Sequence, residues 1–313
     1  MPEWKILLTD GLEQNGQDIL RAAAQVDNRA GISADDLLKV VGEYDALIVR
    51  GRTKVTAAVF DAAPRLKVVG RAGVGVDNID LNAAKAHNVI VVNSPTATTI
   101  AVAELTLGLM LAVVREIPRA DTTMKAGQWI KKELEGRELW RKTLGVIGFG
   151  RIGTEVARRA KAFDMEILAY DPLLPAEAIR LRGGEPVSLD ELLRRADMIT
   201  LHVPLDENTR NLLNAEAFAK MKDGVYIICA ARGGVIDEEA LLQALNSGKV
   251  AGAGLDVFAT EPPGATALVT HPKVVCTPHI GAQTVEAQTR AAEDIATEVL
   301  AALEGKPLRW RVA

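Results

Sequence analysis

The stretch TLGVIGFGRIG, residues 143–153, constrains the fold more than any other part of the chain. Gly148, Gly150 and Gly153 have the spacing G-x-G-x-x-G, between a short apolar run and an amphipathic pattern. Without that context the spacing is a weak signal, and a glycine-rich turn without a ligand is the alternative. After a strand and before a helix, it indicates a dinucleotide-binding unit of a parallel sheet. The free N–H groups of Arg151 and Ile152, at the helix start, would then face a pyrophosphate.

The rest of the chain alternates apolar runs with amphipathic patterns. The runs that we interpret as strands are 5–9, 45–50, 66–73, 89–93, 143–150, 165–171, 197–204, 223–231, 250–258 and 273–278. Continuous apolar strands that alternate with helices predict parallel sheets covered on both faces. The stretch 98–120 is apolar nearly all round and predicts one long buried helix. We therefore expect two doubly wound α/β domains with a ligand site in the cleft between them.

Composition restricts the partners and the location of the protein. A length of 313 residues is typical of about two domains, and 48% apolar residues is ordinary for a globular protein. The net charge of −4 gives no overall attraction to nucleic acid or to a membrane surface. The two cysteines have no metal-ligand spacing, and the N-terminus lacks the apolar core of a signal peptide. These features favour a cytoplasmic protein that binds a small anion through local basic residues.

Asp171 follows the apolar run after the glycine loop. A carboxylate at this place accepts hydrogen bonds from the ribose hydroxyls of the adenosine and repels a 2′-phosphate. The following residues, DPLLP, contain no arginine that would attract such a phosphate. The sequence therefore predicts NAD rather than NADP as the cofactor.

Four further motifs follow one another in a characteristic order: RAGVGVDNID (71–80), AARGGVIDE (230–238), GLDVFATEPP (254–263) and TPHIGAQT (277–284). With the glycine loop, they make essentially the whole chain resemble the D-isomer-specific 2-hydroxyacid dehydrogenases. The resemblance implies a flavodoxin-like substrate domain, residues 1–93 plus 284–313, and a Rossmann NAD-binding domain, residues 94–283. It also implies a homodimer or a homotetramer.

The resemblance places the catalytic roles on Arg232, Glu261 and His279. The planar guanidinium of Arg232 would hold the substrate carboxylate in two hydrogen bonds. His279 would exchange the hydroxyl proton, and Glu261 would fix its tautomer and stabilise the imidazolium. Taken singly, a lone histidine is more often structural, and EPP at 261–263 is typical of a turn.

The resemblance also implies a set of cofactor contacts. Beyond the glycine loop and Asp171, they are Val74, Val203, Pro204, Ala230, Ala231, Arg232, Asp256, His279, Gly281 and Ala282. A strand-end aspartate that caps a turn is the alternative for Asp256. We assign no chemistry to His202, and small residues at 281 and 282 would let the nicotinamide amide approach the backbone.

The substrate is expected to bind at the N-terminal motifs. Arg50 and Arg52 alternate after a strand, point the same way and suit a phosphate. Val74 and Gly75 offer backbone N–H groups, and Thr98 stands where phosphate-accepting members of the family usually carry asparagine. Lys131 and Lys132 either reach a neighbouring subunit or form a solvated face. Arg232 and His279 also belong to the expected set of substrate-binding residues.

We expect the first of the following three functions, because the arginine cluster suits a small phosphorylated anion, and keep the other two as alternatives. The first is NAD-dependent oxidation of 3-phosphoglycerate to 3-phosphohydroxypyruvate, a step of serine biosynthesis. The second is reduction of glyoxylate, hydroxypyruvate or another 2-oxo acid. The third is a non-enzymatic NADH-sensing protein, because corepressors resemble the same family.

Overall fold

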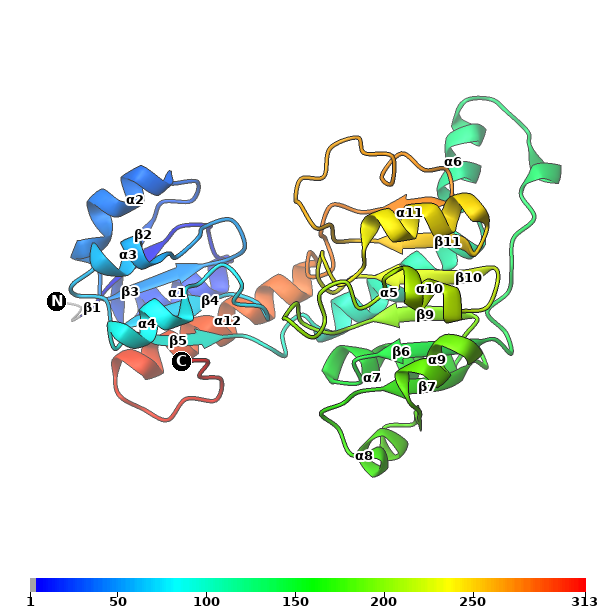
Figure 1. The fold of residues 1–313 in the computed structure, drawn as a ribbon. Coiled ribbons are helices and arrows are strands. Elements are labelled where there is room, and N and C mark those ends of the chain that lie inside the picture. The colour runs from blue at the N-terminus through cyan, green and yellow to red at the C-terminus, as the bar shows by residue number, and fades with distance from the viewer. Residues whose placement is uncertain (1–3) are drawn as a thin grey trace. The chain divides into compact units, whose positions relative to one another are not determined.

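The protein is described here by a computed structural model that covers residues 4–313. The chain divides into two compact units: the residues up to Thr98 together with Ala282–Ala313, and Thr99–Gly281. Each unit is a parallel sheet with helices on both faces (Figure 1). The predicted class, two doubly wound α/β units, is confirmed.

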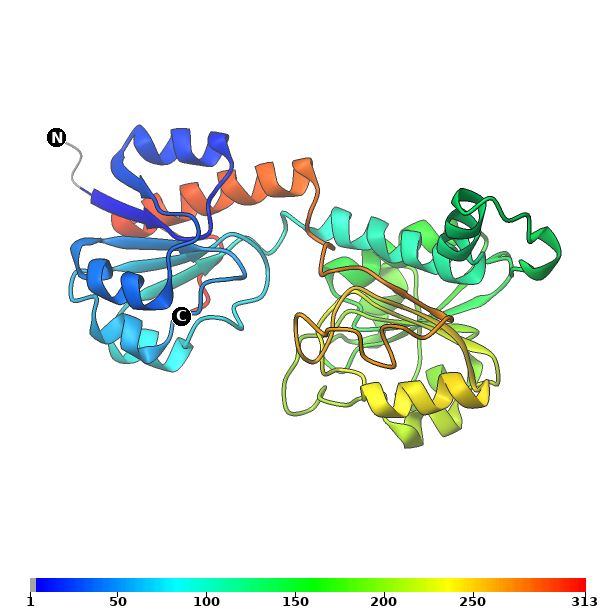
Figure 2. The same ribbon diagram turned by 90° about the horizontal axis from the view of Figure 1, so that it is seen from above.

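The first unit contains a five-stranded sheet in the order β2-β1-β3-β4-β5. Helices α1 and α12 cover one face, and α2, α3 and α4 cover the other (Figure 2). The strands are β1 (Trp4–Leu8), β2 (Ala24–Asn28), β3 (Ala46–Val49), β4 (Val68–Arg71) and β5 (Ile90–Asn93). The helices are α1 (Gln14–Arg21), α2 (Ala34–Val40), η1 (Val41–Glu43), α3 (Ala57–Asp61), α4 (Leu81–Ala86) and α12 (Val285–Leu303).

Local sequence explains how these elements form and pack. All four residues of β3 are buried, as expected for a central strand covered on both faces. Ser33, Asp80 and Thr284 accept hydrogen bonds from backbone N–H groups in the first turns of α2, α4 and α12. Gly16 lets α1 pack directly on α12, because a Cβ there would lie 2.7 Å from the carbonyl oxygen of Ala292.

The second unit contains a seven-stranded sheet in the order β12-β11-β10-β9-β6-β7-β8. Helices α5 and α7 pack on one face, and α9, α10 and α11 pack on the other. The strands are β6 (Thr143–Ile147), β7 (Glu166–Tyr170), β8 (Glu185–Pro186), β9 (Met198–Leu201), β10 (Val225–Cys229), β11 (Val250–Leu255) and β12 (Val274–Cys276). The helices are α5 (Thr99–Val114), α6 (Ile117–Lys125), η2 (Lys131–Glu133), α7 (Arg151–Lys161), α8 (Ala176–Leu181), α9 (Leu189–Arg195), α10 (Ala215–Lys220) and α11 (Glu238–Ser247).

The structure differs from the sequence expectations at the predicted helix 98–120 and at the edge strands β2 and β8, neither of which was predicted. The predicted helix 98–120 is wrong as a single element, because the chain breaks between α5 and α6. Glu116 has a left-handed backbone with φ of 50°, and Pro118 lies in the first turn of α6, where its missing N–H costs nothing. Strand β2 was not predicted, because AQVDN lies at the edge of the sheet and is mostly polar.

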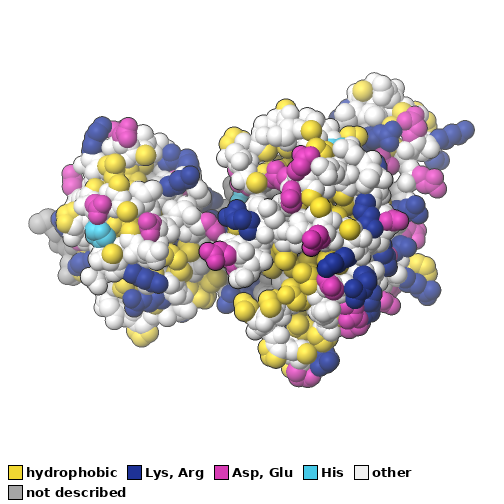
Figure 3. Space-filling view, in the orientation of Figure 1, with side chains coloured by type: hydrophobic (Ala, Val, Ile, Leu, Met, Phe, Trp, Pro, Cys, Tyr) yellow, Lys and Arg dark blue, Asp and Glu magenta, His cyan; other side chains and the backbone are white. Residues whose placement is uncertain are grey.

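Charge is mixed on the surface of both units. Basic and acidic side chains are interspersed on the face shown in Figure 3. Within residues 4–313, none of the helices combines the length and the hydrophobicity that a membrane crossing requires.

Candidate active site

The second unit presents its predicted site residues at one edge of its sheet. The glycine loop follows β6, Asp171 follows β7, Val203 and Pro204 follow β9, Arg232 follows β10, Asp256 follows β11 and His279 follows β12. These strands are all parallel, so their carboxyl ends meet at the same edge.

The glycine loop has the geometry that a pyrophosphate site requires. Gly148 has φ of +87°, and a Cβ there would lie 2.6 Å from the carbonyl oxygen of His202. A Cβ at Gly153 would lie 2.1 Å from the carbonyl oxygen of Gly148. Gly150 caps α7 without a side chain and has open space where a Cβ would stand. The first-turn N–H groups, those of Arg151 and Ile152 included, are therefore accessible to an anion, and these residues fit the dinucleotide.

Asp171 is tied to the same loop. Its Oδ2 accepts a hydrogen bond from the N–H of Phe149 at 2.8 Å, and its Oδ1 accepts one from Leu173 at 2.9 Å. Sequence reasoning missed Arg182, which donates from Nη1 to the carbonyl oxygen of Phe149 at 2.9 Å. A cation therefore lies beside the loop although DPLLP contains none, so the expected preference for NAD depends on Asp171.

His279 and Glu261 form a hydrogen-bonded pair. Nδ1 of His279 lies 2.8 Å from Oε2 of Glu261, while Oε1 of Glu261 accepts the N–H of Phe258 at 3.1 Å. Because the carboxylate accepts, Nδ1 carries the proton in the neutral ring. Nε2 is then the nitrogen that can take a proton from a bound ligand. The imidazole is about half exposed, with a side-chain accessibility of 48%, so a ligand can reach it.

Asp256 shapes the turn that carries His279. Its buried carboxylate accepts hydrogen bonds from Thr277 Oγ1 at 2.6 Å, from the N–H of Ile280 at 2.8 Å and from the N–H of Gly281 at 2.8 Å. The backbone of His279 is left-handed, with φ of 53°. A non-glycine residue in this conformation is uncommon and is often found at functional sites. Asp256 thus caps the turn that carries His279, and its contact with the cofactor stays a prediction.

Arg232 follows β10 and the adjoining residues Ala230 and Ala231. Its Nη1 donates to the carbonyl oxygen of Ala231 at 2.7 Å. Burial raises the pKa of the nearby Cys229 thiol to about 11, so this cysteine stays protonated and unreactive at neutral pH. At the end of β10, the side chain of Cys229 is therefore neutral and that of Arg232 is charged.

His202 has the environment of a structural residue. Although the residue as a whole is only partly buried, its Nδ1 is inaccessible, and its Nε2 lies 3.0 Å from Thr200 Oγ1. Burial lowers the pKa of the imidazole to about 3, so the ring stays neutral. This agrees with assigning it no proton chemistry.

In the first unit, the predicted substrate residues have local partners or open N–H groups. Nη1 of Arg50 lies 3.6 Å from Oε2 of Glu13. Nη2 of Arg52 donates to the carbonyl oxygen of Thr9 at 2.9 Å and lies 3.3 Å from Oδ1 of Asp10.

The other members of this predicted set differ in exposure. Within residues 4–313, the backbone N–H groups of Val74 and Gly75 have no acceptor. Thr98 is buried, whereas Lys131 and Lys132 lie exposed on η2. The N–H groups of Val74 and Gly75 are therefore available to a carboxylate. Arg52 would have to give up its present partners to bind a phosphate.

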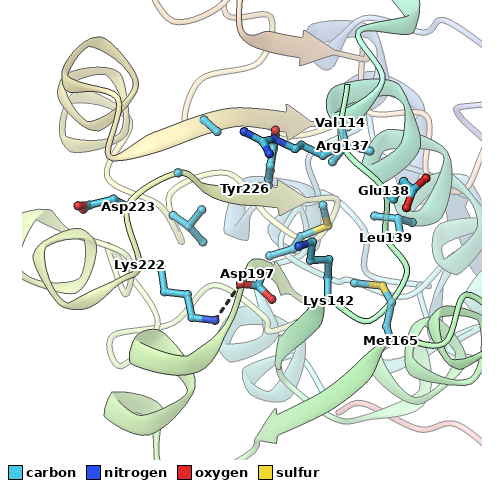
Figure 4. Close-up of a pocket in the computed structure, with 14 residues that line it drawn as sticks. Val114, Arg137, Glu138, Leu139, Lys142, Met165, Asp197, Lys222, Asp223 and Tyr226 are labelled. Carbon is cyan, nitrogen blue, oxygen red and sulfur yellow. Dashed lines mark hydrogen bonds and ion pairs between the residues drawn. The ribbon is translucent and has the colours of Figure 1, made fainter. Parts of the chain in front are cut away.

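A cavity of about 270 Å³ lies at the opposite, amino-terminal end of the strands of the second unit (Figure 4). Lys222 pairs with Asp197 at 2.8 Å, and Asp223 pairs with Lys249 at 2.9 Å. The charges around this cavity therefore largely neutralise one another, and none of the predicted site residues lines it.

Comparison with known proteins agrees with this geometry. Residues 107–281 match the family described as D-isomer specific 2-hydroxyacid dehydrogenase, NAD binding domain. The chain is 48% identical to D-3-phosphoglycerate dehydrogenase of Synechocystis sp. over 98% of its length, and it spans 56% of that relative. It is 47% identical to hydroxypyruvate reductase of Thermotoga maritima, covering 96% of this chain and 98% of that protein. A crystal structure of a glyoxylate reductase from Paecilomyes thermophila superposes with a TM-score of 0.91 at 33% identity, covering 100% of this chain and 99% of that one.

The chain spans little more than half the length of the phosphoglycerate dehydrogenases that it matches. The family match nevertheless extends from α5 through the turn that carries His279, so it contains the glycine loop, Arg232 and Glu261. It confirms both the resemblance that the motifs indicated and NAD as the cofactor. The chain belongs to the D-isomer specific 2-hydroxyacid dehydrogenase family.

Proposed function

We propose that this protein oxidises a D-2-hydroxy acid to the 2-oxo acid with NAD, and that the acid is 3-phosphoglycerate. The observation that carries the proposal is the 2.8 Å contact between Nδ1 of His279 and Glu261. It leaves Nε2 as an accessible proton acceptor at the edge of a sheet that also carries a dinucleotide loop. The names of the phosphoglycerate dehydrogenases, at 48% and 49% identity, support the choice of acid.

Each residue has a distinct role in the proposed reaction. Arg232 holds the carboxylate of the acid, and Nε2 of His279 takes the hydroxyl proton while Glu261 stabilises the resulting imidazolium. The hydride acceptor for the C2 hydrogen is supplied by bound NAD. Its pyrophosphate is assigned to the N–H groups of α7 and its adenosine ribose to Asp171. Val203, Pro204, Ala230, Ala231, Gly281 and Ala282 line its path.

The first unit supplies the proposed substrate-recognition groups. We assign residues 1–93 plus 284–313 to a substrate domain and residues 94–283 to the NAD-binding domain. Val74 and Gly75 would donate to the carboxylate, Arg50 and Arg52 would bind the phosphate, and Thr98 would stand beside the substrate. The open N–H groups of Val74 and Gly75 support this assignment.

The test is the absorbance of NADH formed from NAD and 3-phosphoglycerate. Hydroxypyruvate, glyoxylate and pyruvate with NADH complete the panel. Turnover with 3-phosphoglycerate that exceeds turnover with the other acids supports the proposal. Turnover confined to the unphosphorylated acids would assign the protein to the second candidate function.

Reduction of hydroxypyruvate or glyoxylate is that second candidate, and one observation favours it. The guanidinium of Arg52 is already held by Thr9 and Asp10, so a phosphate would have to compete with these partners. The hydroxypyruvate reductase of T. maritima is also matched over 98% of its length. A complete lack of turnover with intact NADH binding would instead favour a non-enzymatic NADH sensor.

We further propose a cytoplasmic homodimer or homotetramer that binds neither nucleic acid nor membranes. The mixed surface charge and the net charge of −4 support the choice of partners. Sedimentation equilibrium of the purified protein distinguishes the dimer from the tetramer.

A further inference from the structure

The peptide unit Phe258–Ala259 begins the turn that carries Glu261 and packs against the loop that carries Arg232. It lies so close to Gly233 that a Cβ there would be 1.8 Å from the carbonyl oxygen of Phe258. The residue after Arg232 therefore packs directly on the start of the ATEPP turn. Any movement of this peptide changes where Glu261 stands relative to Arg232.

The side chain of Glu238 holds this peptide from the other side. Glu238 is the first residue of α11, and its Oε1 accepts the N–H of Ala259 at 2.6 Å. The neighbouring N–H, that of Phe258, donates to Oε1 of Glu261 at 3.1 Å, which leaves Oε2 of Glu261 for His279. Two carboxylates thus bind two successive N–H groups, and only one of the two carboxylates belongs to the catalytic pair.

We infer that Glu238 is a positioning residue, which sets the catalytic pair by fixing the Phe258–Ala259 peptide against Gly233. The cap of α11 does not depend on it, because Asp237 accepts the N–H groups of Glu239 and Ala240. Glu238 is partly buried and contacts the turn rather than its own helix. Its effect on turnover rests on the proposed function, whereas its effect on the His279 ring does not.

The experiment compares Glu238→Ala, Glu238→Gln and the matched control Glu239→Ala. Glutamine keeps an acceptor oxygen for Ala259, and Glu239 is an exposed neighbour whose side chain accepts a hydrogen bond from Gln243 at 3.2 Å. Displacement of catalytic groups by about 1 Å can cost about a hundredfold in rate, so we expect Glu238→Ala to lower kcat by roughly ten- to a hundredfold. Glu238→Gln and Glu239→Ala should stay within about twofold of the parent, and the Kd for NADH, from fluorescence titration, should not change in any variant.

A second readout is independent of activity. Two-bond proton–nitrogen spectra of protein labelled with ¹⁵N-histidine report the tautomer of His279, whose signal is assigned by its loss in His279→Asn. The Nδ1–H form should persist in Glu238→Gln and become mixed in Glu238→Ala. Parental kcat and tautomer in Glu238→Ala would overturn the inference, as would equal losses in the Ala and Gln variants. A parent without turnover would refute the proposed function alone, because the spectra still test Glu238.

Discussion

The carboxyl edges of the two sheets are built differently. In the second unit, polar groups from neighbouring strand ends bind one another's backbone: Asp256 holds the His279 turn, and Asp171 holds the glycine loop. The α7 N–H groups and Nε2 of His279 are left open. In the first unit, the cations Arg50 and Arg52 lie against acidic residues of nearby loops. One edge is preorganised for proton transfer and pyrophosphate binding, whereas the two arginines of the other edge must exchange partners to bind an anion.

The most severe loss of activity is expected when the proton acceptor is removed from the preorganised edge. His279→Asn should lower kcat by about a thousandfold, because general acid–base catalysis contributes roughly a hundred- to ten-thousandfold. The Kd for NADH, from fluorescence titration, should stay within about twofold, since the glycine loop is untouched. A kcat near that of the parent would show that another group moves the proton.

The next effect concerns the cofactor end of the same edge. Asp171→Ala should lower the preference for NAD over NADP roughly tenfold or more, because a charged hydrogen bond contributes about 1.5–3 kcal/mol. The ratio of kcat/KM for the two cofactors measures the change. Asp171→Asn is the matched control, because its oxygen can still accept from Phe149 while the charge is gone. If Asn keeps the selectivity of the parent, charge repulsion of the 2′-phosphate is not its cause.

The two arginines of the first unit are expected to differ in role, one in stability and the other in substrate binding. Arg52→Ala should lower the free energy of unfolding by about 1–2 kcal/mol, because it removes charged hydrogen bonds to the backbone beside Asp10. Arg50→Ala should change stability little and raise KM for 3-phosphoglycerate about tenfold. Urea denaturation and steady-state kinetics distinguish the two. An equal rise in KM for unphosphorylated hydroxypyruvate would mean that Arg50 does not bind the substrate phosphate.

The smallest effect tests the buried end of β9. The folded pKa of His202, about 3, is below the ordinary value of 6.5, so the unfolded chain binds more protons below pH 6.5. The free energy of unfolding therefore falls as the pH drops from 6.5 toward 3. His202→Gln should remove this part of the loss, which amounts to roughly 1 kcal/mol between pH 7 and pH 5.5. Urea denaturation at both pH values measures it, and parallel losses in parent and variant would contradict a buried neutral imidazole.

Much of the fold follows from local patterns. The apolar runs predicted the fully buried strands, such as β3 and β9, because central parallel strands are covered on both faces. Strand β2 was not predicted from the sequence, since an edge strand needs few apolar residues. The break between α5 and α6 was also not predicted, because the stretch 98–120 was interpreted as one helix, whereas the backbone of Glu116 is left-handed.

The site divides along the same line. Residue types and motif order were enough to predict roles for the glycine loop, Asp171, Arg232, Glu261 and His279, because the chemistry needs those side chains after strands. The partners of Asp256, Arg52 and Glu238 could not be read from the sequence. Each binds a backbone group that lies many residues away along the chain. Such contacts depend on how close two loops come, and that distance follows from sheet order and packing rather than from periodicity.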